Sequence, residues 1–127
     1  MSVDQKIINI NEYELLTNEN DFTVAIRAVA DRTEREGHPG VLSYQFFVDE
    51  PNRTAGACIT YADADAWLVH HEIAYGWEEM PNFQKNVKLA RVLLLGPLNE
   101  GMRAWLEKAN VPCEVLRINN HAAGFER

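Results

Sequence analysis

The chain has 127 residues, of which 46% are apolar and 24% charged, and it carries a formal net charge of −7. This length predicts one domain, residues 1–127, with a hydrophobic core of its own. The composition excludes a disordered chain. The acidic balance argues against nucleic acids and anionic membranes as partners.

The sequence contains no feature that directs a chain out of the cytoplasm. Residues 1–6 (MSVDQK) lack the apolar stretch of a secretory leader. No apolar run approaches the roughly 18 residues of a membrane-spanning helix. Cys58 and Cys113 do not form a C-x-x-C pair, and nothing in their placement calls for a disulfide. We therefore expect a cytoplasmic protein.

The first third of the chain predicts a strand followed by a helix. Residues 6–10 (KIINI) are typical of a strand, whose extension to Leu16 is left open. The polar residues 17–21 (TNEND) offer helix caps. From Phe22 onward, apolar side chains recur at i, i+4 and i+7, which predicts an amphipathic helix. It ends at residues 36–40 (EGHPG), where glycine and proline stop it.

The next segments predict a hairpin and a second helix. Residues 41–48 (VLSYQFFV) and 54–61 (TAGACITY) are rich in aromatic and β-branched residues. Residues 49–53 (DEPNR) form the turn between these two strands. Asp63 then caps a helix over residues 64–75.

The last third predicts two helices and two strands. A short helix covers residues 81–88, with proline at its start, and a strand follows over residues 89–96 (LARVLLLG). Asn99 caps an amphipathic helix. A final strand covers residues 113–118 (CEVLRI), and residues 121–127 form a tail.

These elements follow the order β-α-β-β-α-β over residues 6–96, and residues 97–127 add a helix and a strand. This order predicts an α+β fold of the ferredoxin-like type, an antiparallel sheet with helices on one face. In residues 41–48 and 89–95, apolar side chains occupy both sides of the strand, whereas a sheet with one wet face alternates. We therefore expect a homodimer in which the second face is covered by another copy of the chain.

Three segments give the chain a resemblance to a known family. Residues 39–44 (PGVLSY) resemble a P-G-x-x-x-Y entry into the second strand, and residues 91–96 (RVLLLG) resemble a closing strand. Residues 61–70 (YADADAWLVH) are similar to a strand end with an acidic cap and an A-x-x-x-H helix. In this order the segments resemble the antibiotic biosynthesis monooxygenase-like (ABM) proteins of the dimeric α+β barrel superfamily.

The resemblance covers residues 6–96 and implies a homodimer with a pocket between each sheet and its helices. The activities it implies are diverse. They include cofactor-free oxygenation of aromatic polyketides or quinols, haem degradation and isomerisation, and some members have no known reaction.

His70 and His71 are the first candidates for catalysis. They follow Trp67 on the predicted helix, and we expect one of them to face a cleft and the other to face outward. Imidazole titrates near neutrality, so it can shuttle a proton or donate a hydrogen bond to a bound carbonyl. The alternative is a histidine packed in the core and bonded to a neighbour. The resemblance favours His70, which matches the family's helical histidine.

Aromatic side chains and one amide are the candidates for substrate binding. Cofactor-free oxygenation needs an apolar cavity and a group that polarises or deprotonates a phenolic substrate near O₂. The candidate residues are Asn9, Tyr44, Tyr61, Trp67 and Trp77, with Phe46 and Phe47 as further wall residues. The alternative is that these aromatic side chains only pack the core and the dimer interface.

Other chemistries find little support. The zinc motif H-E-x-x-H begins at His71, but Tyr75 stands at the second histidine position, so no metal is expected. Ser2 and Ser43 lie outside a G-x-S-x-G motif, and no phosphate-binding loop is present. Cys58 is either a nucleophile or a small buried residue.

No bound cofactor is expected. Some haem-degrading members of the family use an Asn–Trp–His set, which Asn9, Trp67 and His70 or His71 match by residue type. In this chain the histidines follow the tryptophan by only three or four residues. That spacing is closer than the family's set implies, which argues against haem, and flavin is not expected either.

Two functions are compatible with the sequence. One is a small cofactor-independent monooxygenase, an oxidoreductase acting on an aromatic, phenolic or quinol-type molecule. The other is a non-catalytic dimeric small-molecule-binding or stress-response protein, because a fold alone does not define a function. A cleft with His70, a tyrosine hydroxyl and apolar walls favours the enzyme. A cavity filled by large side chains favours the binding protein.

Overall fold

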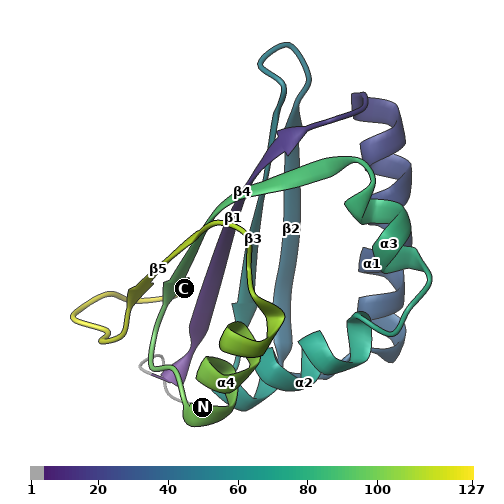
Figure 1. Ribbon diagram of the computed structural model, residues 1–127. Helices are drawn as coiled ribbons and strands as arrows, with labels where there is room; N and C mark the ends of the chain where they lie inside the picture. The colour runs from purple at the N-terminus through teal and green to yellow at the C-terminus, as the bar shows by residue number, and fades with distance from the viewer. Residues whose placement is uncertain (1–4) are drawn as a thin grey trace.

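The computed structural model describes residues 5–127. Most of the N-terminal segment considered above for a secretory leader, residues 1–4, lies outside the described residues. Figure 1 shows the arrangement of the elements. In chain order they are β1 (Ile7–Leu15), α1 (Glu19–Glu36), β2 (Val41–Asp49), β3 (Thr54–Tyr61), α2 (Ala64–Ala74), α3 (Glu79–Gln84), β4 (Val87–Leu95), α4 (Glu100–Ala109) and β5 (Glu114–Ile118). Within residues 5–127, no helix has the length and apolar character needed to cross a membrane.

The strands form one sheet in the order β2-β3-β1-β4-β5. The first four strands of the chain pair antiparallel, which confirms the predicted ferredoxin-like α+β arrangement. The fifth strand departs from the expected antiparallel sheet, because β5 pairs with β4 in parallel, with Leu93 opposite Leu116. Helix α4 is the crossover that such a parallel pair requires, so the extension makes the sheet mixed.

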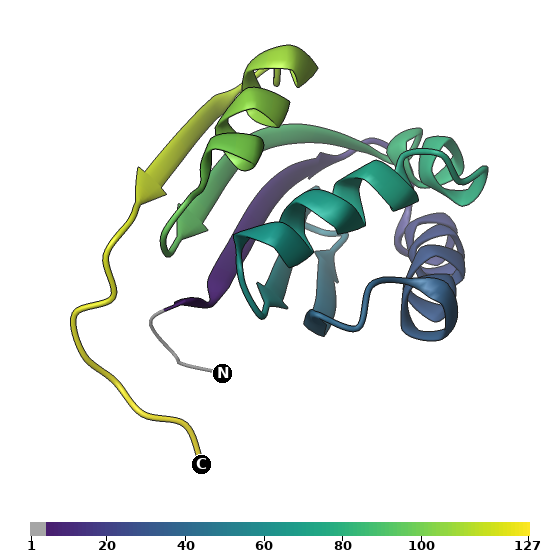
Figure 2. The same cartoon turned by 90° about the horizontal axis from the view of Figure 1, so that it is seen from below.

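The helices lie on one side of the sheet, and the C-terminal arm of residues 119–127 lies on the other side (Figure 2). Three helix starts follow polar caps within the predicted segments. The side chains of Asn18, Asp63 and Asn99 each accept a hydrogen bond from the backbone N–H three residues later. Such caps satisfy N–H groups that the helix itself leaves without partners.

The predicted boundaries of two neighbouring elements are wrong. The short helix spans Glu79–Gln84 instead of residues 81–88, and β4 begins at Val87 instead of residue 89. Asn86 ends the helix because its side-chain amide donates to a helix carbonyl at 3.0 Å, while its own carbonyl accepts the Leu16 N–H at 2.8 Å. The bond between Leu16 and Asn86 places the chain beside β1, so β4 begins two residues before the predicted position.

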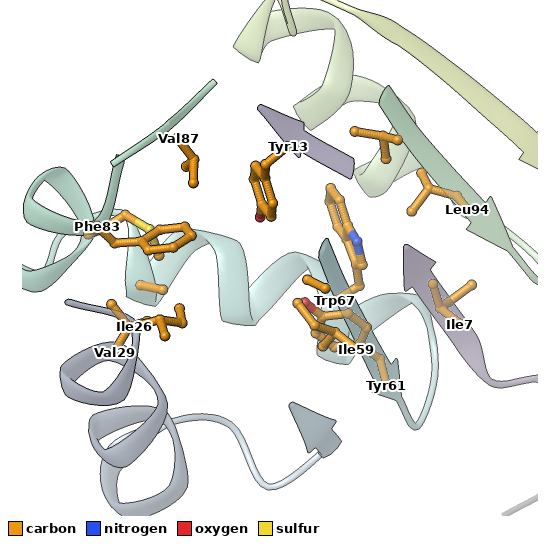
Figure 3. Packing of buried hydrophobic residues seen from close by; sticks show 14 of the residues in the cluster. Ile7, Tyr13, Ile26, Val29, Ile59, Tyr61, Trp67, Phe83, Val87 and Leu94 are labelled. Atoms are coloured by element: carbon orange, nitrogen blue, oxygen red, sulfur yellow. The ribbon is translucent and has the colours of Figure 1, made fainter. Parts of the chain in front are cut away.

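The core lies between the helices and the facing side of the sheet, where alternate residues of β1, β3 and β4 point inward (Figure 3). Its most completely buried large side chains are Trp67, Tyr61, Phe22, Ile7, Leu15, Leu94, Met102 and Val29. Gly40 allows the start of β2 to approach α2 closely. A Cβ at this position would lie 2.5 Å from the Ala66 methyl carbon, so packing explains the glycine of the PG segment.

The opposite side of the sheet, called here the outer face, carries two rows of apolar side chains. Cross-strand pairing places Cys58, Ile10, Leu93 and Leu116 in one row and Ile8, Leu95 and Ile118 in the next. A charged row borders them, in which Glu12 and Arg91 pair at 2.8 Å. Leu116 is 44% exposed and Ile118 51% exposed. The apolar second face that the strand pattern predicts is therefore present, and in the single chain its β5 end is exposed while the rest is partly buried.

Candidate active site

A cavity of about 120 Å³ lies between the sheet and helices α2 and α3. For comparison, an apolar cavity of about 150 Å³ is large enough to bind benzene. The polar lining residues are Asn9, Asn11, Tyr13, Tyr44, Tyr61, His70, His71, Tyr75 and Gln84, and the apolar ones are Phe46, Ile59, Met80, Phe83, Val87 and Leu89. This cavity is somewhat smaller than the benzene-binding one, so a substituted ring would need the lining side chains to move apart. Its wall combines apolar surface with hydrogen-bonding groups.

Helix α2 presents both histidines to this cavity. His70 is buried, with 4% of its surface exposed. His71 is half-buried and stacks on Trp67, with 3.7 Å between ring centroids. The Nδ1 atom of His71 lies 2.7 Å from the Trp67 carbonyl oxygen and donates to it, because a carbonyl can only accept. Both histidines line the cavity, and His71 is the more exposed of the two.

Two buried polar atoms at the cavity have no hydrogen-bond partner within residues 5–127. They are the Tyr61 hydroxyl and Nδ1 of His70. The His70 ring lies 5.5 Å from the Tyr44 ring and 5.7 Å from the Tyr61 ring, measured between centroids. Leaving a buried polar group unpaired costs free energy. These two atoms are therefore available to hydrogen-bond a molecule in the cavity.

Burial sets the protonation states of the lining residues. It lowers the pKa of His70 to about 4 and the pKa of His71 to about 3. Burial also raises the pKa of Tyr13, Tyr44 and Tyr61 above their ordinary range. At pH 7 the cavity therefore combines neutral imidazoles with protonated phenols, since burial disfavours the charged form of each group.

Strand β1 carries a row of hydrogen bonds along the cavity. The strand ends at Leu15, one residue short of the longer of the two predicted extents. Trp67 Nε1 donates to Asn9 Oδ1 at 2.9 Å. Asn9 Nδ2 then donates to Asn11 Oδ1 at 2.8 Å, and Asn11 Nδ2 donates to the Tyr13 hydroxyl oxygen at 2.9 Å. We call these four side chains the β1 relay.

The predicted site residues divide into three groups. Those that line the cavity are Asn9, Tyr44, Tyr61, His70 and His71. Trp67 lies behind the cavity wall, where it stacks on His71 and bonds Asn9. Trp77 is not part of the lining and instead packs under Arg32, whose guanidinium carbon is 4.6 Å from the ring centroid.

The remaining candidates lie elsewhere. Phe46 lines the cavity, whereas Phe47 belongs to the opposite side of β2 and is 63% exposed. Cys58 lies in a row of the outer face, so it cannot act as a nucleophile in this cavity. Within residues 5–127, no group of three His, Cys, Asp or Glu side chains is placed to hold a metal ion.

Several lining residues were not predicted. For Asn11 and Tyr13 a signal exists, because the alternation Asn9-x-Asn11-x-Tyr13 places three polar side chains on one side of a strand. Met80 and Phe83 of α3 carry no such signal, since their position depends on how a short helix packs against distant strands.

The extension after β4 supports the histidine side of the site. Trp105 of α4 lies edge-on to Trp67, with 5.3 Å between ring centroids. Its ring is also 4.9 Å from His71 and 5.4 Å from Tyr75. The extension therefore forms an outer layer of the aromatic cluster behind the cavity.

No protein-family model matches the chain, and no curated protein matches its sequence. Several solved structures match its fold. MupZ from Pseudomonas fluorescens has a TM-score of 0.69 at 18% identity, over 97% of this chain and 95% of that protein. SnoaB, a cofactor-independent oxygenase from Streptomyces nogalater, has a TM-score of 0.56 at 12% identity, over 71% and 90%. A candidate antibiotic biosynthesis monooxygenase from Caulobacter crescentus CB15 has a TM-score of 0.50 at 16% identity, over 72% and 87%.

These similarities define the class of fold. The chain has the fold of the ABM-like proteins, as the resemblance implies. The match with MupZ spans nearly the whole chain and so includes the extension that forms α4 and β5. At identities of 12–18%, the structural similarity shows the fold alone, because one fold hosts many reactions.

Proposed function

We propose that this protein is a small cofactor-independent oxygenase that acts on a single-ring phenol or quinol in the cavity. The observation that carries the proposal is the unpaired Nδ1 of buried His70 together with the unpaired Tyr61 hydroxyl. The fold shared with SnoaB, itself described as a cofactor-independent oxygenase, supports it. The open cavity with polar groups favours an enzyme over a binding protein that keeps only the fold.

His70 is the proposed base. Its pKa of about 4 keeps the ring neutral at pH 7, and with the ring proton on Nε2 the Nδ1 lone pair accepts a phenolic proton. A phenolate that forms beside the ring raises the imidazole pKa, because opposite charges stabilise each other. The Tyr61 hydroxyl donates to the ligand oxygen and stabilises its developing charge.

Hydroquinone illustrates the proposed reaction. One atom of O₂ forms a new C–O bond on the ring, and the other atom leaves as water with two hydrogens from the substrate. The ring loses four electrons and becomes a hydroxyquinone, and O₂ accepts these four electrons. The deprotonated ring is the reductant, so the balance needs no oxidant other than O₂.

Oxygen uptake with hydroquinone tests this function. We expect His70→Ala to lower kcat/KM by about 10²–10⁴-fold, the usual contribution of a general base, without changing the oligomeric state. His121→Ala, in the exposed arm, is the matched control and should keep the wild-type rate. Uptake by the wild-type protein that does not exceed autoxidation in buffer would reject an oxygenase of this substrate. Full activity of His70→Ala would reject His70 as the base.

We also propose that the chain acts as a homodimer joined through its outer faces. The two apolar rows of this face are the argument, because exposed patches of this kind mark interaction sites. The C-terminal arm lies on the same side of the sheet (Figure 2), and its Phe125 is 77% exposed. A twofold pair would cover the rows of both copies at once.

A further inference from the structure

The direction of every hydrogen bond in the β1 relay is determined by its first member. The indole N–H of Trp67 can donate and cannot accept, so the Asn9 amide must present its oxygen to Trp67. The Asn9 NH₂ group then faces Asn11, which must accept with its own oxygen. Asn11 therefore presents its NH₂ group to Tyr13. No amide in this row can be reversed without placing two donors against each other.

At the end of the relay, the Tyr13 hydroxyl oxygen accepts, and its hydrogen must point elsewhere. No group within residues 5–127 accepts a hydrogen bond from this hydroxyl. Tyr13 is 8% exposed and lines the cavity. Figure 3 shows its hydroxyl directed away from β1, toward the space bounded by Phe83 and Tyr61. Burial raises the pKa of Tyr13, so the hydroxyl keeps its proton at pH 7.

We infer that Tyr13 is a fixed hydrogen-bond donor to a ligand oxygen, and that Asn9 and Asn11 are positioning residues that set its direction. The inference deepens the proposed function, since it requires a ligand in the cavity. It predicts that the site selects rings that carry an oxygen acceptor over hydrocarbon rings of the same shape. A phenolic hydroxyl both donates and accepts hydrogen bonds, so it suits a cavity that holds an acceptor at His70 and a donor at Tyr13.

The test uses two fluorinated probes of nearly equal shape, 4-fluorophenol and 4-fluorotoluene, with binding to the full chain followed by ¹⁹F NMR. Tyr13→Phe removes only the hydroxyl. Asn11→Asp keeps the size of the side chain but replaces its donor by an acceptor, so that the Tyr13 hydroxyl turns back toward β1. Asn20→Asp, at an exposed position of α1, is the control for the added charge.

We expect Tyr13→Phe and Asn11→Asp each to lower the affinity for 4-fluorophenol about fivefold, the typical effect of one hydrogen bond. The affinity for 4-fluorotoluene should stay the same. A merely structural role would weaken both probes alike, so the ratio of the two affinities is the decisive measurement.

An unchanged ratio in both variants would overturn the role of Tyr13 and leave the proposed ligand site intact. Failure of both probes to bind the wild-type protein would overturn the ligand site and this inference with it. If Asn11→Asp does not fold, the ratio measured with Tyr13→Phe decides alone.

Discussion

The imidazole of His71 lies on the indole of Trp67, with 3.7 Å between ring centroids and 24° between ring planes. The same indole donates to Asn9 on β1. One side chain therefore orients a histidine on α2 and starts the β1 relay, which connects the two walls of the cavity. Trp67 does not line the cavity; it positions His71 and Asn9, which do.

His70 and His71 should make the stability of the protein depend on pH. Their native pKa values of about 4 and about 3 lie below the ordinary value of 6.5. Between the native pKa values and pH 6.5 the unfolded chain binds more protons than the native chain. The free energy of unfolding is therefore highest above pH 6.5 and falls as the pH is lowered. Each histidine contributes a slope that rises from about half of 1.4 kcal/mol per pH unit at pH 6.5 to nearly that full value at pH 5.

Urea unfolding between pH 6.5 and pH 5 checks this prediction, because most carboxylates titrate below that window. We expect His70→Gln to remove about half of the slope, since only His71 then remains neutral by burial. His121→Gln, in the exposed arm, should leave the slope unchanged. A slope that is the same in wild type and His70→Gln would contradict the burial of a neutral His70.

Features of this fold that depend only on residues close together in the sequence could be predicted. Asp63 and Asn99 cap their helices as expected, because a cap bonds a backbone group three residues away. The end of α3 was misplaced because Asn86 responds to Leu16, a partner far away in the chain. The sequence leaves the place of β5 open for the same reason, because its parallel pairing with β4 joins segments separated by α4.

The candidate site was predictable by residue type and less so by geometry. His70 and Tyr61 line the cavity, as their aromatic and polar character indicates. Trp77 shares that character and still lies outside, because Arg32 of α1 covers its ring. The bond between Trp67 and Asn9 joins residues 58 positions apart, and nothing in either local sequence indicates it.

Trp105 should determine how large a ligand the site accepts. Its edge-on contacts with Trp67, His71 and Tyr75 hold the cluster behind the cavity. We expect Trp105→Ala to lower the free energy of unfolding by about 2 kcal/mol, less than for a fully buried tryptophan. The loosened cluster should let 1-naphthol bind more tightly relative to phenol, as measured by calorimetry. Trp105→Phe, which keeps an aromatic ring, should preserve the wild-type ratio, and an unchanged ratio in Trp105→Ala would count against this role.

The proposed dimer makes a prediction about the middle of the outer face. Leu93 lies in an apolar row between Ile10 and Leu116. Leu93→Lys would bury two unpaired ammonium groups in a twofold interface, at a cost of several kcal/mol each. We expect the variant to sediment as a monomer at concentrations at which the wild-type chain is a dimer.

The control is Val24→Lys, since Val24 is also apolar and 64% exposed but lies on α1, away from the outer face. Its oligomeric state should match that of the wild type. Circular dichroism should show that both variants are folded, because neither side chain belongs to the buried core. A wild-type chain that sediments as a monomer would mean that the apolar rows stay in contact with water, and the proposed dimer would be wrong. In that case the oxygenase proposal would still stand, because every residue that lines the cavity comes from a single chain.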